Sequence, residues 1–319
     1  MPVDPVREPR VPAGLNLLIA GMVGTITLAT LFLAPRLLAA GQGWAAWLVI
    51  PFAIAAVTDW GLVHEAVHGH LHPSPSINYR VGRLLAVLFL APFDALRFGH
   101  LSHHALNAKA AERPELYDPR QRSALRARAV YYVRLLGGIH LIEVASGPLA
   151  LLPRPLLRPI VRRAFYDGAA DATHMADRAE RTLLARATLR RIRVDGLAIL
   201  ALLGTSTLIY ASAWPILVVA LFGRALVISV MDNAPHYGGP LAEPDQGFDM
   251  HLPEPLRPLV LNTNLHGTHH RHPNLPWNDL PRAFLADGGQ YAGSYLAVPW
   301  RQLRGPMPLE PGAVGPGLS

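Results

Sequence analysis

Four short clusters of histidine are the segments of this sequence with the clearest capacity for chemistry. They are His64-Glu65-Ala66-Val67-His68, His100-Leu101-Ser102-His103-His104, Asp232-Asn233-Ala234-Pro235-His236 and His266-Gly267-Thr268-His269-His270. On a helix, residues three and four positions apart share one face, so histidines at this spacing point in the same direction. Asp232 and Asn233 stand four and three positions before His236, so on a helix either one can lie beside it. This spacing indicates metal ligands.

The number and type of these side chains limit the metal centre. The clusters contain nine histidines and one Asp/Asn position, which is too many ligands for one tetrahedral zinc ion and the right number for two metal ions. The chain contains no cysteine, which excludes disulfides, thiolate nucleophiles, iron–sulfur clusters and Cys-ligated zinc. We therefore expect a site of two metal ions held by imidazoles.

The chain is 51% hydrophobic and only 16% charged, which indicates membrane-spanning segments together with a polar part. The long apolar segments must therefore position the histidine clusters. Gly14 to Pro35 is long enough to cross a bilayer, and a second uncharged run ends at Asp59. Gly196 to Met231 is too long for one crossing, and two spans that turn near Ala213-Trp214-Pro215 fit it better. Arg224 lies near the end of the fourth span, where its side chain can snorkel to the surface. These segments predict an all-α integral membrane protein with four transmembrane helices in two hairpins.

The spans place all four clusters on one side of the membrane. His64 follows the second span and His236 follows the fourth, so two crossings separate them. Residues 120–193 carry 15 Arg against five acidic residues, and the positive-inside rule makes this region cytoplasmic. Leu84 to Phe93 is too short to span and Ala129 to Pro153 is interrupted by charge, so both are expected to be interfacial helices.

These segments define one domain with a cytoplasmic helical cap that carries the two-metal site. The expected parts are an N-terminal arm (1–12), a first transmembrane hairpin (14–60), a cytoplasmic and interfacial region with the first two clusters (61–193), a second hairpin (194–231), a cytoplasmic region with the last cluster (232–304) and a flexible tail (305–319). The start has no signal-peptide pattern. We expect a bacterial inner (cytoplasmic) membrane location, with both termini and the metal site cytoplasmic.

The pattern of one HxxxH box, two HxxHH boxes and an additional His resembles the membrane fatty acid desaturase and hydroxylase superfamily. The resemblance extends from Asp59 to Phe284, and the segment Asn262 to His270, followed by Pro273, Pro276 and Trp277, is similar to the third box of that family. It implies a non-haem di-iron centre, O2 as co-substrate, and a cap that guides an acyl or isoprenoid chain to the metals. Imidazole suits Fe(II), and vacant coordination positions let O2 bind and form an oxidant for an unactivated C–H bond.

The resemblance also implies a ligand set. Matched box by box, the ligands are His64, His68, His100, His103, His104, His236, His266, His269 and His270. Many family members have Asn at the position four before the additional His, where this chain has Asp232 followed by Asn233, so the tenth ligand is open. The most expected reaction is desaturation of a fatty acyl or lipid chain. Hydroxylation or ketolation of a lipid or carotenoid at the same site is the alternative.

Electrons for this chemistry must come from a partner. The sequence has no haem motif, no cysteine and no Gly-rich dinucleotide fingerprint. A ferredoxin, or a cytochrome b5-like protein with its reductase, is the expected donor, and the Arg-rich region is the expected docking face. No basic stripe interleaved with aromatic residues supports nucleic-acid binding.

Alternative interpretations explain less of the pattern. His64-Glu65 to His68 is also the HExxH motif of zinc proteases, but an intramembrane protease leaves seven clustered histidines without a role. A metal-storage or transport protein would need ionisable residues within the spans, which nearly lack them.

Other polar residues near the boxes have less defined roles. We interpret His140, His174, His251 and His272 as structural or surface residues, and the role of His72 is open. The expected hydrogen-bond acceptors behind the ligands are Glu65, Asp94, Glu112, Asp118 and Asp279.

Overall fold

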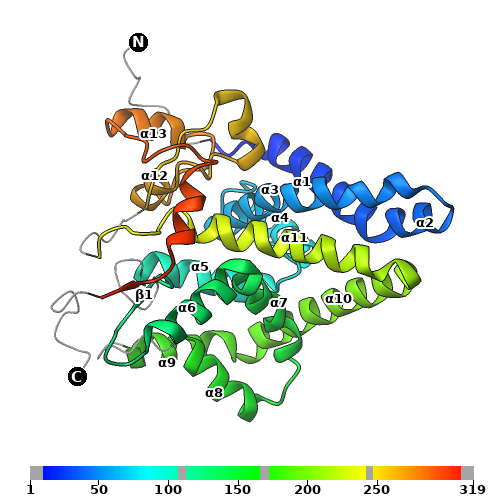
Figure 1. Ribbon diagram of the computed structural model, residues 1–319, viewed down its shortest axis with the longest axis horizontal. Helices are drawn as coiled ribbons and strands as arrows, with labels where there is room; N and C mark the ends of the chain where they lie inside the picture. Colours follow the sequence, from blue (N-terminus) through cyan, green and yellow to red (C-terminus); the bar gives the residue numbers. More distant parts are fainter. Residues whose placement is uncertain (1–9, 107–112, 166–171, 242–246, 310–319) are drawn as a thin grey trace.

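The computed structural model describes residues 10–106, 113–165, 172–241 and 247–309. The chain is mainly helical in these ranges, and the only strands there are β1 (Leu116–Tyr117) and β2 (Met307–Pro308), which pair in parallel. Elongated helices extend to one end of the molecule, and shorter helices gather at the other (Figure 1). This division agrees with an apolar bundle that carries a polar cap.

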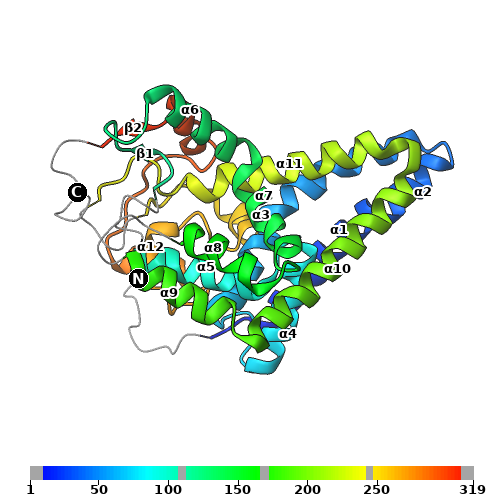
Figure 2. The ribbon, with the colours of Figure 1, turned by 90° about the horizontal axis from the view of Figure 1, so that it is seen from below.

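The elongated part contains two helical runs that each turn back on themselves. The first run comprises α1 (Ala13–Leu28), α2 (Ala34–Ala39) and, after the turn, α3 (Val49–His68). The second comprises α10 (Arg186–Tyr210) and α11 (Trp214–Asn233), which meet at the far end in Figure 2. The predicted turn near Ala213 is confirmed, because a 3-10 turn at Ala211–Ala213 separates α10 from α11.

Among the described residues, three helical segments are long and apolar enough to cross a membrane, namely 13–39, 43–68 and 186–233, the last of which contains both α10 and α11. A fourth candidate arises if α4 (Pro75–Leu88) and α5 (Phe93–Leu106) form one span bent by 98°. One expected helix end is wrong. The first helix continues past Pro35, because the wider π-helical turn Ala29–Leu33 accommodates the proline. Helix α3 continues from the uncharged run that ends at Asp59 through the first histidine box to His68.

The expectation that Arg224 snorkels to the surface is also wrong. Its side chain is fully buried between α3 and α11, and its Nη2 donates to Asp59 Oδ2 at 2.6 Å. The guanidinium also lies over the rings of Phe52 and Phe89. A buried charge is costly unless it is paired, so the ion pair and the two aromatic faces take the place of water.

The cap surrounds the ends of α3 and α11. Its further elements are α6 (Ala124–Val133), α7 (Ile139–Leu149), α8 (Arg154–Ala164), α9 (Ala172–Leu183), a 3-10 helix (Glu254–Val260), α12 (His266–Arg271), α13 (Leu280–Ala286) and a 3-10 helix (Val298–Arg304). Helix α7 packs closely on α10 because Gly147 and Gly196 face each other, and a Cβ on Gly196 would lie 2.7 Å from Gly147 O.

The C-terminal segment is partly ordered, contrary to the expected flexible tail from Gly305. Strand β2 pairs with β1, and Met307 N donates to Glu115 O at 2.7 Å. The pairing satisfies backbone groups that a free tail would leave to water. Residues 310–319 and most of the expected arm (1–9) lie outside the described ranges.

Candidate metal centre

The nine clustered histidines form two compact groups, in each of which the nearest ring nitrogens lie within 4.8 Å of one another. The five-histidine group contains His64, His68, His100, His104 and His269. The four-histidine group contains His103, His236, His266 and His270. All four sequence clusters therefore meet in one place, and Asp232 is not among the grouped residues.

The two HxxHH boxes divide their histidines between the groups. In α5, His100 and His104 face the five-histidine group, whereas His103 faces the other. In α12 the two groups exchange places: His266 and His270 belong to the four-histidine group, and His269 belongs to the five-histidine group. Positions i and i+4 thus serve one group and position i+3 serves its neighbour. The sequence interpretation, in which all three point the same way, needs this correction.

Ring nitrogens form a continuous row in each group. In the five-histidine group, His269 Nε2 lies 3.0 Å from His64 Nε2 and 3.1 Å from His104 Nε2. His100 Nε2 lies 2.9 Å from His68 Nε2 and 3.0 Å from His104 Nε2. A ring nitrogen offers one hydrogen or one lone pair, so hydrogen bonds alone do not satisfy a nitrogen with two such neighbours.

The four-histidine group has the same spacing. His236 Nε2 lies 3.1 Å from His103 Nε2 and 2.9 Å from His266 Nε2, which is 3.0 Å from His270 Nε2. A metal–nitrogen bond of about 2.1 Å separates ligands at right angles by about 3.0 Å and tetrahedral ligands by about 3.4 Å. The observed spacing therefore fits a metal ion with ligands at right angles better than a tetrahedral ion.

The imidazoles of α12 are held in the neutral form that binds metals. Burial, followed by the charges of neighbouring histidines, lowers the pKa of His266, His269 and His270 far below its usual value. A neutral ring keeps a free lone pair at neutral pH, which a metal ligand requires.

Local structure explains how each box presents its rings. Helix α3 ends immediately after His68, because Gly69 adopts a left-handed conformation with φ of 86°. Helix α12 begins at His266, and Asp249 fixes its first turn by accepting from Thr268 N at 2.8 Å and Thr268 Oγ1 at 2.9 Å. Sequence reasoning missed Asp249, since nothing in the local spacing relates it to Thr268, 19 positions later.

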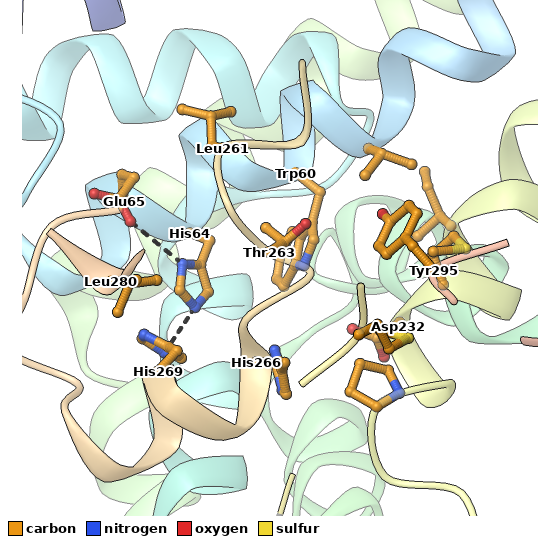
Figure 3. Close-up of a pocket in the computed structure, with 15 residues that line it drawn as sticks. Trp60, His64, Glu65, Asp232, Leu261, Thr263, His266, His269, Leu280 and Tyr295 are labelled. Carbon is orange, nitrogen blue, oxygen red and sulfur yellow. Dashed lines mark hydrogen bonds and ion pairs between the residues drawn. The ribbon is translucent and has the colours of Figure 1, made fainter. Parts of the chain in front are cut away.

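Glu65 is the predicted acceptor that lies closest to a ligand. Its Oε1 is 3.7 Å from His64 Nδ1, and its Oε2 accepts from Trp277 N at 3.2 Å. Trp277 Nε1 donates to Asn16 Oδ1 at 2.9 Å, which connects α1 to the first and third boxes. Figure 3 shows His64 between Glu65 on one side and His269 on the other.

The other predicted acceptors bind elsewhere. Asp94 pairs with Arg191 at 2.6 Å, Asp118 with Arg120 at 3.1 Å, and Asp279 accepts from Arg10 N at 3.3 Å. Glu112 lies outside the described residues. Of the described candidates, Glu65 is therefore the one whose contacts fit the expected role.

The segment before the additional histidine differs from the expected helix. Helix α11 ends at Asn233, and His236 lies in the following turn, because Pro235 has no N–H to continue the helical bonding. Asn233 Nδ2 donates to Gln302 Oε1 at 2.6 Å, and Asp232 lines the cavities beside the histidine groups. Asp232 as a tenth ligand stays a prediction.

Two of the remaining histidines have defined local roles. His72 Nδ1 accepts from Ser74 N at 2.9 Å, and the helix that would have continued the row from His68 has already ended. His140 is buried, its Nδ1 lies 3.0 Å from Glu143 Oε2, and burial lowers its pKa to about 3. Both contacts agree with structural roles.

A cavity of about 520 Å³ opens beside the histidine groups. Its inner end is lined by Trp60, His100, His103, Asp232, Asn233, His236 and His266. From there it continues between α5, α7, α8, α9 and α10, where mostly apolar side chains such as Ile142, Leu157 and Leu184 line it. A smaller pocket of about 40 Å³ shares Trp60, Asp232 and His266 with this cavity and is also lined by His64 (Figure 3).

Comparison with known proteins agrees with this arrangement. The profile of the fatty acid desaturase family matches residues 42–302, which include all four histidine clusters. The chain belongs to the fatty acid desaturase family. It is similar to a Delta(12)-fatty-acid desaturase of Arabidopsis thaliana, with 29% identity over 114 residues. That match covers 35% of this chain and 28% of the plant protein.

Proposed function

We propose that this protein is a membrane di-iron oxidoreductase that uses O2 to desaturate a fatty acyl or lipid chain. The observation that carries the proposal is the junction of two histidine groups with a largely apolar cavity of about 520 Å³. The nine imidazoles are the proposed ligands, and their nitrogen spacing fits two ions. Bound iron would supply the site at which O2 is reduced.

The residues of the chain have separate tasks in this reaction. The histidines would hold the ions, and the apolar side chains of α7, α8 and α9 would position an extended hydrocarbon chain and exclude water. Desaturation removes two hydrogens from adjacent carbons. With two electrons and two protons from outside the chain, O2 is then reduced to two waters. The electrons require a donor such as a ferredoxin or a cytochrome b5-like protein with its reductase.

We further propose the membrane arrangement expected from the sequence. Four transmembrane helices in two hairpins would hold the cap and both termini on the cytoplasmic side of a bacterial inner membrane. The arginine excess of residues 120–193 supports this orientation. The expected single domain with its six parts belongs to the same proposal.

The intramembrane zinc-protease hypothesis fits the geometry less well. It requires one ion at His64 and His68, but both rings lie in a group with three further histidines. The Glu65 carboxylate, which would be the general base, faces Trp277 N.

The decisive experiment combines metal analysis with product analysis. Detergent-purified protein is expected to contain about two irons per chain. With ferredoxin, ferredoxin reductase and vesicles of labelled phospholipid, it should form an unsaturated chain in an O2-dependent reaction. One zinc per chain with peptidase activity would overturn the proposal, whereas a hydroxylated lipid or carotenoid product would assign the alternative oxidation.

A further inference from the structure

The two histidine groups differ in how their ligands are held. Every histidine of the five-histidine group lies on a helix, namely α3, α5 or α12. In the four-histidine group, His236 lies in a turn after α11. A turn has no ladder of helical hydrogen bonds, so other contacts must fix the position of this ring.

A buried arginine makes the closest of these contacts. Arg113 is 1% exposed, and its Nη2 donates to His236 O at 2.5 Å and to Gly239 O at 3.0 Å. Its Nε donates to Glu115 Oε1 at 2.8 Å, and Gly238 N also approaches this oxygen at 3.4 Å. The ion pair thus holds the turn at His236, Gly238 and Gly239. A buried charge pair is expensive to desolvate, so a contact of this kind suggests positioning rather than stability alone.

The C-terminal segment 298–308 completes the same arrangement. The fully buried Gln302 accepts from Asn233 Nδ2 and donates to Val230 O at 2.8 Å, which fixes the end of α11. Tyr237, the residue after His236, donates its hydroxyl to Gly305 O at 2.7 Å. Strand β2 holds Glu115 through the bond from Met307 N to Glu115 O. The turn is therefore bound on one side by Arg113 and Glu115 and on the other by segment 298–308.

We propose that Arg113, Glu115 and segment 298–308 form a clamp that positions His236 and controls metal retention in the four-histidine group only. The inference rests on the proposed function, because it requires that both groups bind metal. The five-histidine group keeps its ion without the clamp, so a defective clamp produces a protein with one metal per chain. Arg113 and Gln302 are positioning residues, since they contact the turn and the helix end that carry the ligand.

The test measures iron per chain in detergent-purified holoenzyme before and after dialysis against a chelator. The double variant Arg113→Met with Glu115→Leu removes the clamp without leaving an unpaired buried charge. We expect it to fall from about two irons to about one, and Arg113→Lys to restore part of the loss. The matched control removes another internal ion pair, Arg83 with Asp195, by Arg83→Met with Asp195→Leu, and should keep two irons.

Two ligand variants, each combined with the clamp variant, show which histidine group loses its ion. With His103→Ala, which already impairs the four-histidine group, the clamp variant should cause no additional loss. With His104→Ala it should remove the ion that remains. Loss of both ions together, or retention of both by the clamp variant, would overturn the clamp. A wild-type chain without two irons would instead contradict the proposed function.

A milder variant covers the case in which the double variant does not fold. Tyr237→Phe removes one hydrogen bond from the clamp and leaves the ligands unchanged. Loss of one neutral hydrogen bond should speed chelator-driven release of one iron about fivefold. The other iron should be released at the wild-type rate. Equal acceleration for both ions, or none for either, would contradict the proposal.

Discussion

The two walls of the large cavity are built differently. The inner wall consists of α3, α5, α12 and the end of α11. Histidines line it, and its helices α3 and α11 also carry the buried ion pair of Asp59 with Arg224. The outer wall consists of α7, α8 and α9, and its ion pairs, such as Arg158 with Glu180, lie at the surface. The difference teaches that the clustered histidines lie on the inner wall, whereas the outer wall presents mainly apolar side chains to the cavity.

The largest effect is expected from removing a ligand of the inner wall. His269→Ala should lower both iron content and turnover. Turnover should fall by at least ~100-fold, because loss of a ligand should reduce activity more than loss of a residue that only supports a ligand. His272→Ala is the matched control at the end of α12, since His272 pairs with Asp287 at the surface. Equal loss in the two variants would show that the integrity of α12 matters rather than ligation.

Breaking a buried ion pair and breaking an exposed one should lower the free energy of unfolding by different amounts. Asp59→Asn leaves the fully buried Arg224 without its partner, and we expect a loss of about 3–5 kcal/mol in the free energy of unfolding. Arg158→Gln breaks an exposed pair on the outer wall and should cost less than about 1 kcal/mol. Unfolding in detergent would measure both, and similar losses would remove the distinction between the walls.

A change in the outer wall should alter substrate preference without altering metal content. Leu157 on α8 is buried and lines the cavity away from the histidines. Leu157→Phe reduces the space for a long chain, and we expect kcat/KM for long chains to fall relative to short chains by about 3- to 10-fold. Iron content should stay at the wild-type value. An unchanged chain-length profile would argue that the substrate does not occupy this part of the cavity.

The smallest effect concerns the pH dependence of stability at Glu143 on the outer wall. Burial raises the pKa of Glu143 to about 8. At pH values above the ordinary Glu pKa and below about 8, the folded protein keeps a proton that the unfolded chain has lost. Stability should therefore fall as pH rises through this window. Glu143→Gln should flatten the decline in thermal unfolding temperature, and an unchanged slope would contradict the assignment.

The sequence by itself determined the features that depend on local spacing. The apolar segments predicted the long helices, and the turn near Ala213 followed from the length of a segment too long for one crossing. The histidine boxes were evident because positions i, i+3 and i+4 of a helix are neighbours whatever surrounds it. The absence of cysteine left imidazole as the main donor for a metal. The family resemblance inferred from these boxes is confirmed.

Only the tertiary structure decided which distant residues meet. It divided the boxes into groups of five and four, paired Arg224 with Asp59, and placed Asp249 beneath α12. It also replaced the expected helix at His236 with a turn bound to Arg113 and, through Tyr237, to Gly305, where the flexible tail was expected to begin. These contacts join residues far apart in the chain, and their geometry depends on how whole helices pack. The spacing of residues along the chain does not predict such pairings, so they can be identified only in the folded protein.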